Sequence, residues 1–264
     1  MLSVRSFAAF GGVCALFGTL SGTRAAAEEG MTMRARLEAS RPVVVEMFVS
    51  QACSASPPAA ELLTRLADRT DIVALAWHVD YWDDYPGRGV GPWKDPFAQP
   101  EFSARQLAYN MRFKGRAVKM TPQTVIDGVI TLSGSKREIV ENKIREAQFL
   151  DEMARPSPPR IVMRAAENRT IRARIENVGA PYDALVVNFR PAAETAIEGG
   201  DNAGAMFREA NVVRSVSALA RGHAGAGDFS FEAPQEGLGC AVIVQERNQG
   251  RIVAARYCVA AENQ

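Results

Sequence analysis

The sequence predicts an α/β domain, with a mixed sheet and flanking helices, followed by a small, mainly antiparallel β domain. Apolar runs at 43–49 and 72–79 enclose a segment with helical spacing, which is the pattern of a βαβ unit with parallel strands. The prolines of 155–159 cannot continue a helix and indicate a linker. Beyond it, apolar residues alternate with polar ones, as in half-buried strands. We therefore assign the α/β domain to residues 34–154 and the β domain to residues 160–264.

The α/β domain begins with a β-branched apolar run, Val43–Val49, that is typical of a buried strand. Pro57 and Pro58 suit the first turn of a helix, where missing amide hydrogens cost little, and apolar residues then continue at helical spacing. A second buried strand at 72–79 leads into an insertion at about 80–118. One face of a predicted helix in this insertion carries Phe102, Gln106, Tyr109 and Phe113.

A hairpin and a helix complete the α/β domain. Strands are predicted at 123–126 and 129–132, joined by an Asp-Gly turn. Ser135 and Glu138 have the spacing of a capping box, so Ser135 is expected to cap the last helix.

The β domain contains two cysteines that we expect to pair. Asn248, Gln249 and Gly250 favour a hairpin turn, and with Gln249 at its centre Cys240 faces Cys258. Directly opposed residues bring their Cβ atoms to roughly 4.5–5.5 Å, near disulfide range. We expect a Cys240–Cys258 disulfide, and the alternative is two reduced, packed cysteines.

The first residues have the features of an export signal. Arg5 supplies a positive charge, residues 7–20 are apolar, and Ala25–Ala27 offer small side chains for cleavage. The alternative, a membrane anchor, needs about 20 apolar residues, more than this run provides. We expect removal of residues 1–27, no membrane span in the mature chain and a periplasmic or secreted location. Cysteines tend to pair in such an oxidising compartment.

Composition excludes several classes of function. The 31 basic and 30 acidic residues leave a formal net charge of +1, which gives no reason to expect a nucleic-acid partner or a polybasic membrane patch. Two histidines are too few for a histidine-rich metal cage, and the Gly-x-Ser-x-Gly elbow of serine hydrolases is absent. We expect no cofactor and no resident metal, and the sequence leaves the oligomeric state open.

Cys53 is the cysteine left over once the signal is removed and Cys240 pairs with Cys258. It lies in a turn between a buried strand and a helix. There, backbone amides and the positive helix end stabilise a thiolate, which is the nucleophile of disulfide exchange. The small and polar residues of 51–56 indicate partial exposure, which favours a reactive thiol over a buried, inert one.

The end of the second strand offers candidate cleft residues. His78, Asp80 and Trp82 lie where ligands of open α/β sheets tend to bind, at the carboxyl end of a buried strand. We expect them to form one wall of a cleft beside Cys53, with His78 or Asp80 tuning the thiol. The alternative is that the aromatic residues pack the insertion while the acidic residues cap turns.

A soft-metal site is a further alternative. Cys53 and His78, with Met47 or Met120, would provide ligand types that suit copper. Because Met47 lies in an apolar strand, it is expected to belong to the core.

The order of strand, Cys-x-x-Ser, helix, strand, insertion, Thr-Pro, hairpin and helix resembles the thioredoxin superfamily. More closely, several stretches resemble the exported family named domain of unknown function twelve-twenty-three. These stretches are Val45–Gln51, His78–Asp83, Trp93–Phe97, Ala104–Gln106, Thr121–Gln123 with Asp127–Gly128, Asp201–Gly204 and Asn211–Arg214. The resemblance spans almost the whole mature chain.

The resemblance implies roles for the cysteine turn and for the Thr-Pro pair. Cys53 takes the first position of a Cys-x-x-Cys site, and Ser56 replaces the second cysteine, which in a dithiol site releases the trapped partner. Pro122 becomes the cis-proline and, with Thr121, helps to shape a peptide groove. Gln123 is a further cleft candidate.

We therefore expect monothiol redox chemistry at Cys53. Its partners would be oxidised protein thiols, through mixed-disulfide exchange or reduction of a sulfenic acid, and a low-molecular-weight thiol would resolve the adduct. Ser56 is expected to donate a hydrogen bond to the thiolate. The alternative is a non-catalytic binding module that recognises an envelope protein or ligand.

Overall fold

The computed structural model describes residues 41–87, 91–134, 136–154 and 158–259. The expected signal peptide, 1–27, the expected capping residue Ser135 and residues 155–157 of the expected linker lie outside the described residues.

The described chain contains eleven strands, three longer helices and two short 3-10 helices. The strands are β1 (Val43–Val49), β2 (Ile72–His78), β3 (Gln123–Ile126), β4 (Ile130–Ser133), β5 (Arg160–Ala166), β6 (Thr170–Glu176), β7 (Tyr182–Ala196), β8 (Met206–His223), β9 (Gly227–Glu232), β10 (Gly239–Glu246) and β11 (Ile252–Tyr257). The helices are α2 (Pro57–Ala67), α3 (Pro100–Lys114) and α4 (Arg137–Ala154), with η1 (Asp80–Trp82) and η2 (Gly200–Asn202).

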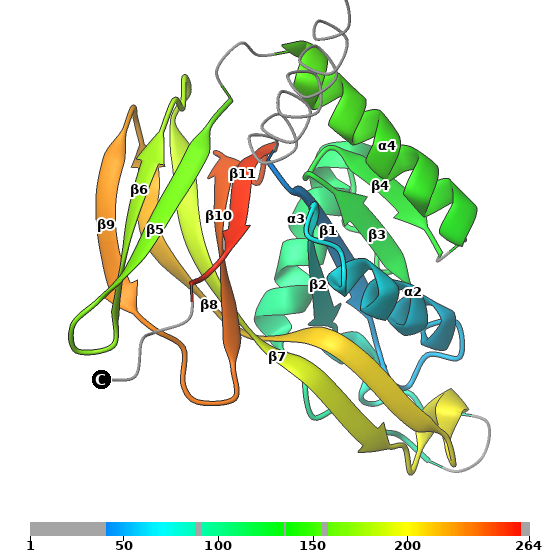
Figure 1. Ribbon diagram of the computed structural model, residues 1–264. Coiled ribbons are helices and arrows are strands. Elements are labelled where there is room, and N and C mark those ends of the chain that lie inside the picture. The colour runs from blue at the N-terminus through cyan, green and yellow to red at the C-terminus, as the bar shows by residue number, and fades with distance from the viewer. Residues whose placement is uncertain (1–40, 88–90, 135, 155–157, 260–264) are drawn as a thin grey trace, which may run out of the picture. The chain divides into compact units, whose positions relative to one another are not determined.

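These elements form a mixed α/β fold with one large mixed sheet and one small antiparallel sheet (Figure 1). The large sheet has eight strands in the order β11-β10-β7-β8-β2-β1-β3-β4, and the small sheet has the order β5-β6-β9. None of the helices in the described part of the chain combines the length and the apolar character needed to cross a membrane.

The centre of the large sheet is the βαβ unit predicted from the sequence. Strands β1 and β2 pair in parallel from Val43↔Ile72 to Val49↔His78, and every residue of both strands is buried. This burial on both faces explains why both strands are apolar almost throughout. The apolar residues of α2 and α4 pack on one face of β1, and Phe102 and Tyr109 of α3 pack on the other.

The large sheet continues into the second half of the chain. Strand β8 meets β2 at Ala76↔Val212, and β7, β10 and β11 extend the sheet by antiparallel pairing. The described residues therefore belong to one compact unit. The border expected at 155–159 does not separate two sheets, because strands on both of its sides belong to the large one.

Strands β7 and β8 form a long hairpin that reaches beyond the neighbouring strands. Their pairing runs from Tyr182↔His223 to Ala196↔Met206, whereas β10 pairs with β7 only as far as Phe189. The outer part of this hairpin lies beside α2, and its tip carries η2 (Figure 1). This arm brings residues near 200 to the turn that follows β1.

The predicted disulfide between Cys240 and Cys258 is present, with a Cα–Cα distance of 5.3 Å. The register predicted from the hairpin holds from Ala241↔Tyr257 to Val244↔Ala254, and a bulge shifts it nearer the turn. The Cys258 amide also donates to the Cys240 carbonyl at 2.8 Å. The hairpin centred near Gln249 therefore positions the two cysteines as expected.

Candidate functional site

The turn between β1 and α2 holds Cys53, the free cysteine of the described chain. The Cys53 amide donates to the Ser50 carbonyl at 3.2 Å, and the Ser56 amide donates to the Cys53 carbonyl at 3.0 Å. Ser54 lies exposed on the crest of the turn, but Cys53 is only 4% exposed. The expectation that Cys53 is partly exposed was therefore wrong, because its side chain is buried against the segment that contains Thr121.

The Cys53 sulfur faces the Thr-Pro pair that precedes β3. Its distance to the Thr121 carbonyl oxygen is 3.8 Å, and the Thr121–Pro122 peptide bond is cis. The Thr121 hydroxyl oxygen is buried and has no hydrogen-bond partner among the described residues. The structure thus brings together Cys53, Thr121 and Pro122, which the sequence separates by almost seventy residues.

Ser56 and Gln123, the other two residues named from the resemblance, make hydrogen bonds inside the protein. The Ser56 hydroxyl oxygen accepts the Ser50 amide at 3.2 Å, which ties the two ends of the turn together. The Gln123 side chain exchanges hydrogen bonds with Asn110, at 2.8 and 3.1 Å, and donates to Thr131 at 2.8 Å. Gln123 therefore joins β3 to α3 and β4 inside the protein.

The tip of the β7–β8 hairpin clamps the cysteine turn. The Asn202 side-chain amide donates to the Gln51 carbonyl at 2.8 Å and to the Cys53 carbonyl at 2.9 Å. The Asp201 amide donates to the Ala52 carbonyl at 3.0 Å. Gly200 has φ +69°, and a Cβ there would come within 3.0 Å of Ala52, so glycine suits this close contact. Sequence reasoning missed this clamp, although Asp201–Gly204 was among the family-like stretches.

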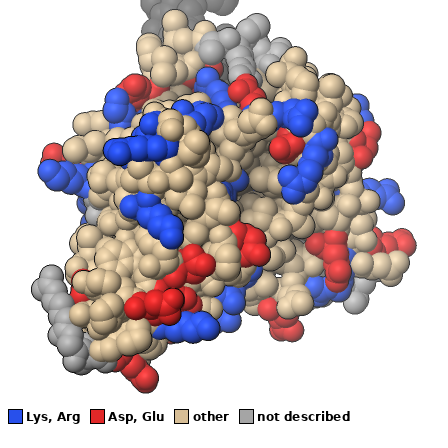
Figure 2. All heavy atoms as spheres, turned by 180° about the vertical axis from the view of Figure 1, so that it is seen from behind, with Lys and Arg blue, Asp and Glu red and all other residues tan. Residues whose placement is uncertain are grey.

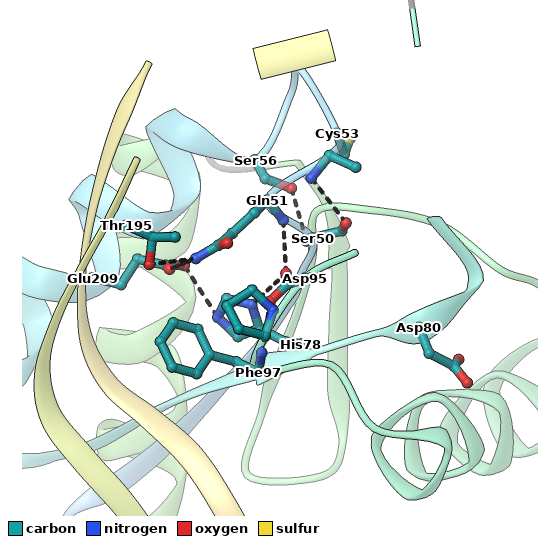
Figure 3. Close-up of polar contacts among 12 residues, drawn as sticks. Ser50, Gln51, Cys53, Ser56, His78, Asp80, Asp95, Phe97, Thr195 and Glu209 are labelled. Atoms are coloured by element: carbon teal, nitrogen blue, oxygen red, sulfur yellow. Dashed lines mark hydrogen bonds and ion pairs between the residues drawn. The ribbon is translucent and has the colours of Figure 1, made fainter. Parts of the chain in front are cut away.

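A buried ion cluster lies beneath the same turn (Figure 3). His78 Nδ1 is 2.7 Å from Asp95 Oδ2. His78 Nε2 is 3.1 Å from Glu209 Oε1, and this second contact is an ion pair without the alignment of a hydrogen bond. Burial alone lowers the pKa of His78, but the two carboxylates outweigh it and raise the pKa to about 10. Burial alone raises the pKa of Asp95, and the imidazolium outweighs it and lowers the pKa. His78 is therefore a buried cation at neutral pH.

Gln51 connects this cluster to the cysteine turn. Its amide donates to Asp95 Oδ2 at 2.9 Å, and its side chain donates to Glu209 Oε2 at 2.8 Å (Figure 3). The Trp93 indole donates to the Gln51 side-chain oxygen at 3.1 Å. The cluster thus braces the backbone that carries Cys53, and His78 acts on the turn through its carboxylate partners and Gln51.

The remaining cleft candidates pack the insertion. Asp80 Oδ1 accepts the Ser103 hydroxyl at 2.5 Å, and Figure 3 shows Asp80 well apart from the His78 cluster. The Trp82 ring packs edge-to-face on Tyr85, with 4.9 Å between ring centroids. These contacts match the alternative stated for this segment.

Tyr81 of η1, which sequence reasoning did not select, carries a half-buried phenol. Burial is the main cause that raises the pKa of Tyr81. The Tyr81 hydroxyl donates to Gln106 Oε1 at 3.0 Å, and Gln106 donates to the Met120 carbonyl at 2.6 Å. These bonds hold the phenol beside the segment that precedes Thr121.

The geometry removes His78 and Met47 from the ligands of the copper alternative. Both His78 nitrogens face carboxylates, and Met47 is fully buried in the apolar core. Within the described ranges, no three His, Cys, Asp or Glu side chains are grouped to hold a metal ion.

Residues 44–245 match the model of a family described as protein of unknown function (DUF1223). The chain belongs to this family. A crystal structure of a protein from Agrobacterium tumefaciens, determined by a structural genomics consortium, is similar to this DUF1223 member with a TM-score of 0.67 and 23% identity. The match covers 84% of this chain and 96% of that one, and at this identity it shows the fold alone. No curated protein matches the DUF1223 member.

Proposed function

We propose that this DUF1223 protein is an exported monothiol exchange protein, with a thioredoxin-like first half and Cys53 as its nucleophile. The observation that carries the proposal is the placement of a free thiol in a turn braced from two sides. The His78 cluster holds the turn from below through Gln51, and Asn202 holds it from the hairpin arm.

The position of Cys53 just before α2 supports its proposed role as the nucleophile. The turn leads directly into α2, whose first turn contains prolines and no acidic residue. The dipole of a helix favours negative charge at its N-terminal end. Because hydrogen bonds hold the turn from two sides, little reorganisation of its backbone is needed during exchange.

The proposed reaction is disulfide exchange. The Cys53 thiolate attacks one sulfur of a partner disulfide R–S–S–R′, so that a Cys53–S–S–R bond forms while R′ leaves as a thiolate. An external low-molecular-weight thiolate then attacks the R sulfur, and Cys53 leaves as a thiolate. Each step breaks one disulfide and forms one, so the exchange needs no further oxidant or reductant.

The second step needs an external thiol because Ser56 stands where a dithiol site has its second cysteine. A hydroxyl cannot displace the mixed disulfide, and the Ser56 oxygen already accepts the Ser50 amide. The proposed partners are therefore oxidised protein thiols and a low-molecular-weight thiol.

Reaction with an aromatic disulfide tests the proposal. The folded protein is expected to release one equivalent of aryl thiolate and to form one adduct on Cys53, with the Cys240–Cys258 disulfide intact. Cys53→Ser is expected to release none, and Ser230→Ala, which changes an exposed serine on β9, serves as the matched control. Release only after unfolding in urea would show that Cys53 is structural.

The low exposure of Cys53 favours one second candidate, a binding module in which the thiol is incidental. In that case a Cys53→Ala variant would retain its partner and complement a deletion strain. Loss of complementation by a folded Cys53→Ala variant would favour the exchange protein instead.

A further inference from the structure

Two arginines of the β7–β8 hairpin lie over one aromatic ring. The Arg214 guanidinium carbon is 5.0 Å from the centroid of Phe97, and that of Arg190 is 6.0 Å from the same centroid. Phe97 is only 7% exposed and belongs to the core. The ring is therefore a fixed platform for two cations from neighbouring strands.

The position of Arg214 is fixed by its neighbours. Its Nη1 donates to the Pro96 carbonyl at 3.3 Å, and its own carbonyl accepts the Gln99 side-chain amide at 2.8 Å. Arg190 is exposed, and the ring is its partner among the described residues. Within the described part of the chain, most of the N–H donors of the two guanidinium groups are thus left without an acceptor.

This pair also lacks neutralising carboxylates. Among the described residues, neither guanidinium has a carboxylate within ion-pair distance, whereas Arg208 on the same arm pairs with Glu194 at 3.2 Å. Burial and the charge of Arg190 together lower the pKa of Arg214, and Asp95 offsets this only in part. The Asp95 oxygens are already occupied by the Gln51 and Phe97 amides and by His78.

The Phe97 ring also packs against the His78 ring, at 5.4 Å between centroids. The three cationic side chains around Phe97 therefore differ in whether carboxylates neutralise them. His78 is neutralised by Asp95 and Glu209, whereas the two arginines are open to solvent-borne anions.

We propose that Arg190 and Arg214, placed on the Phe97 ring, form a binding site for a small dianion that presents carboxylate or phosphate groups. Guanidinium groups recognise both oxyanions with paired N–H donors, and an anion here would relieve the repulsion between the two cations. Figure 3 shows Phe97 apart from Cys53, and the proposed site does not depend on the proposed exchange chemistry.

Isothermal titration at low ionic strength tests the site, with inorganic phosphate and succinate as separate probes and chloride as the only other anion. Saturable binding of at least one probe is expected, and the tighter probe identifies the oxyanion class. Arg190→Gln and Arg214→Gln are each expected to weaken binding about tenfold or more, since hydrogen bonds to charged groups are the stronger kind. Arg190→Lys and Arg214→Lys keep the charge but lose the paired donors, so intermediate weakening is expected.

Arg221→Gln is the matched control, because it removes an exposed arginine from the same strand. Cys53→Ser is expected to bind the probes as the unchanged protein does, which separates this site from the proposed function. Absence of saturable binding for both probes would overturn the proposal. Equal weakening by Arg221→Gln would also overturn it, because the effect would then reflect net charge alone.

Discussion

Removal of the Asn202 clamp should make Cys53 more reactive. Asn202 holds the turn through two hydrogen bonds, at 2.8 Å to the Gln51 carbonyl and at 2.9 Å to the Cys53 carbonyl. With Cys53 only 4% exposed, a reagent can reach the sulfur only when the turn opens. The rate of thiol modification therefore reports the population of the open turn.

The size of the effect follows from the two bonds. Each contributes about 1 kcal/mol net, so Asn202→Ala should lower the free energy of opening by about 2 kcal/mol. Since 1.4 kcal/mol corresponds to about a tenfold change in population, alkylation of Cys53 should become about 30-fold faster. The Cys53 carbonyl keeps its hydrogen bond from the Ser56 amide in the closed turn, so it is not left unpaired there when Asn202 is removed.

The assay is alkylation by iodoacetamide, followed by peptide mass mapping in zero and low urea. Asn142→Ala on α4 is the control, because it removes an asparagine remote from the turn. A local opening should show little dependence on urea, whereas global unfolding should show a steep one. Equal rates in Asn202→Ala and Asn142→Ala, or an increase that follows global stability alone, would refute the role assigned to Asn202.

Three further changes test other parts of the site. Because the folded-state pKa of His78 is about 10, above its unfolded value of about 6.5, its protonation stabilises the fold fully below pH 6.5 and is lost as the pH rises through 10. The free energy of unfolding should therefore fall between pH 6.5 and 10 by up to about 1.4 kcal/mol per pH unit, and His78→Gln should abolish this fall. Urea unfolding at several pH values measures it. Ser56→Cys should prevent the Cys53 adduct from accumulating, because the introduced thiol can displace it, and intact mass spectrometry would detect persistence of the adduct as the contrary result. Replacing Cys240 and Cys258 by serine opens a loop with a sequence separation of 18, so the free energy of unfolding in urea should fall by about 3 kcal/mol. A large loss of exchange at Cys53 in this variant would contradict the separation of the disulfide from the exchange site.

Local patterns were sufficient to predict most elements of the first half. The apolar runs of β1 and β2 predict strands buried on both faces, and the two prolines indicate the start of α2. The Cys240–Cys258 pairing also followed from local information, because a hairpin register is set by its own turn.

The sequence could not predict how the hairpin arm completes the site. Glu209 and Asn202 lie more than 130 residues after His78 and Cys53 in the chain, and no local pattern relates them. Strands β2 and β8 share a single paired position, Ala76↔Val212, and this contact depends on the packing of the whole unit. The burial of Cys53 was missed for the same reason, since small polar neighbours give no information about what covers the turn.

Exchange at Cys53 is tested most directly by intact-mass and peptide mapping of the folded protein after incubation with oxidised glutathione. The proposed chemistry predicts one glutathione on Cys53, its removal by reduced glutathione, and an intact Cys240–Cys258 disulfide. An unmodified Cys53, under conditions where the same thiol is modified in urea-unfolded protein, would contradict it.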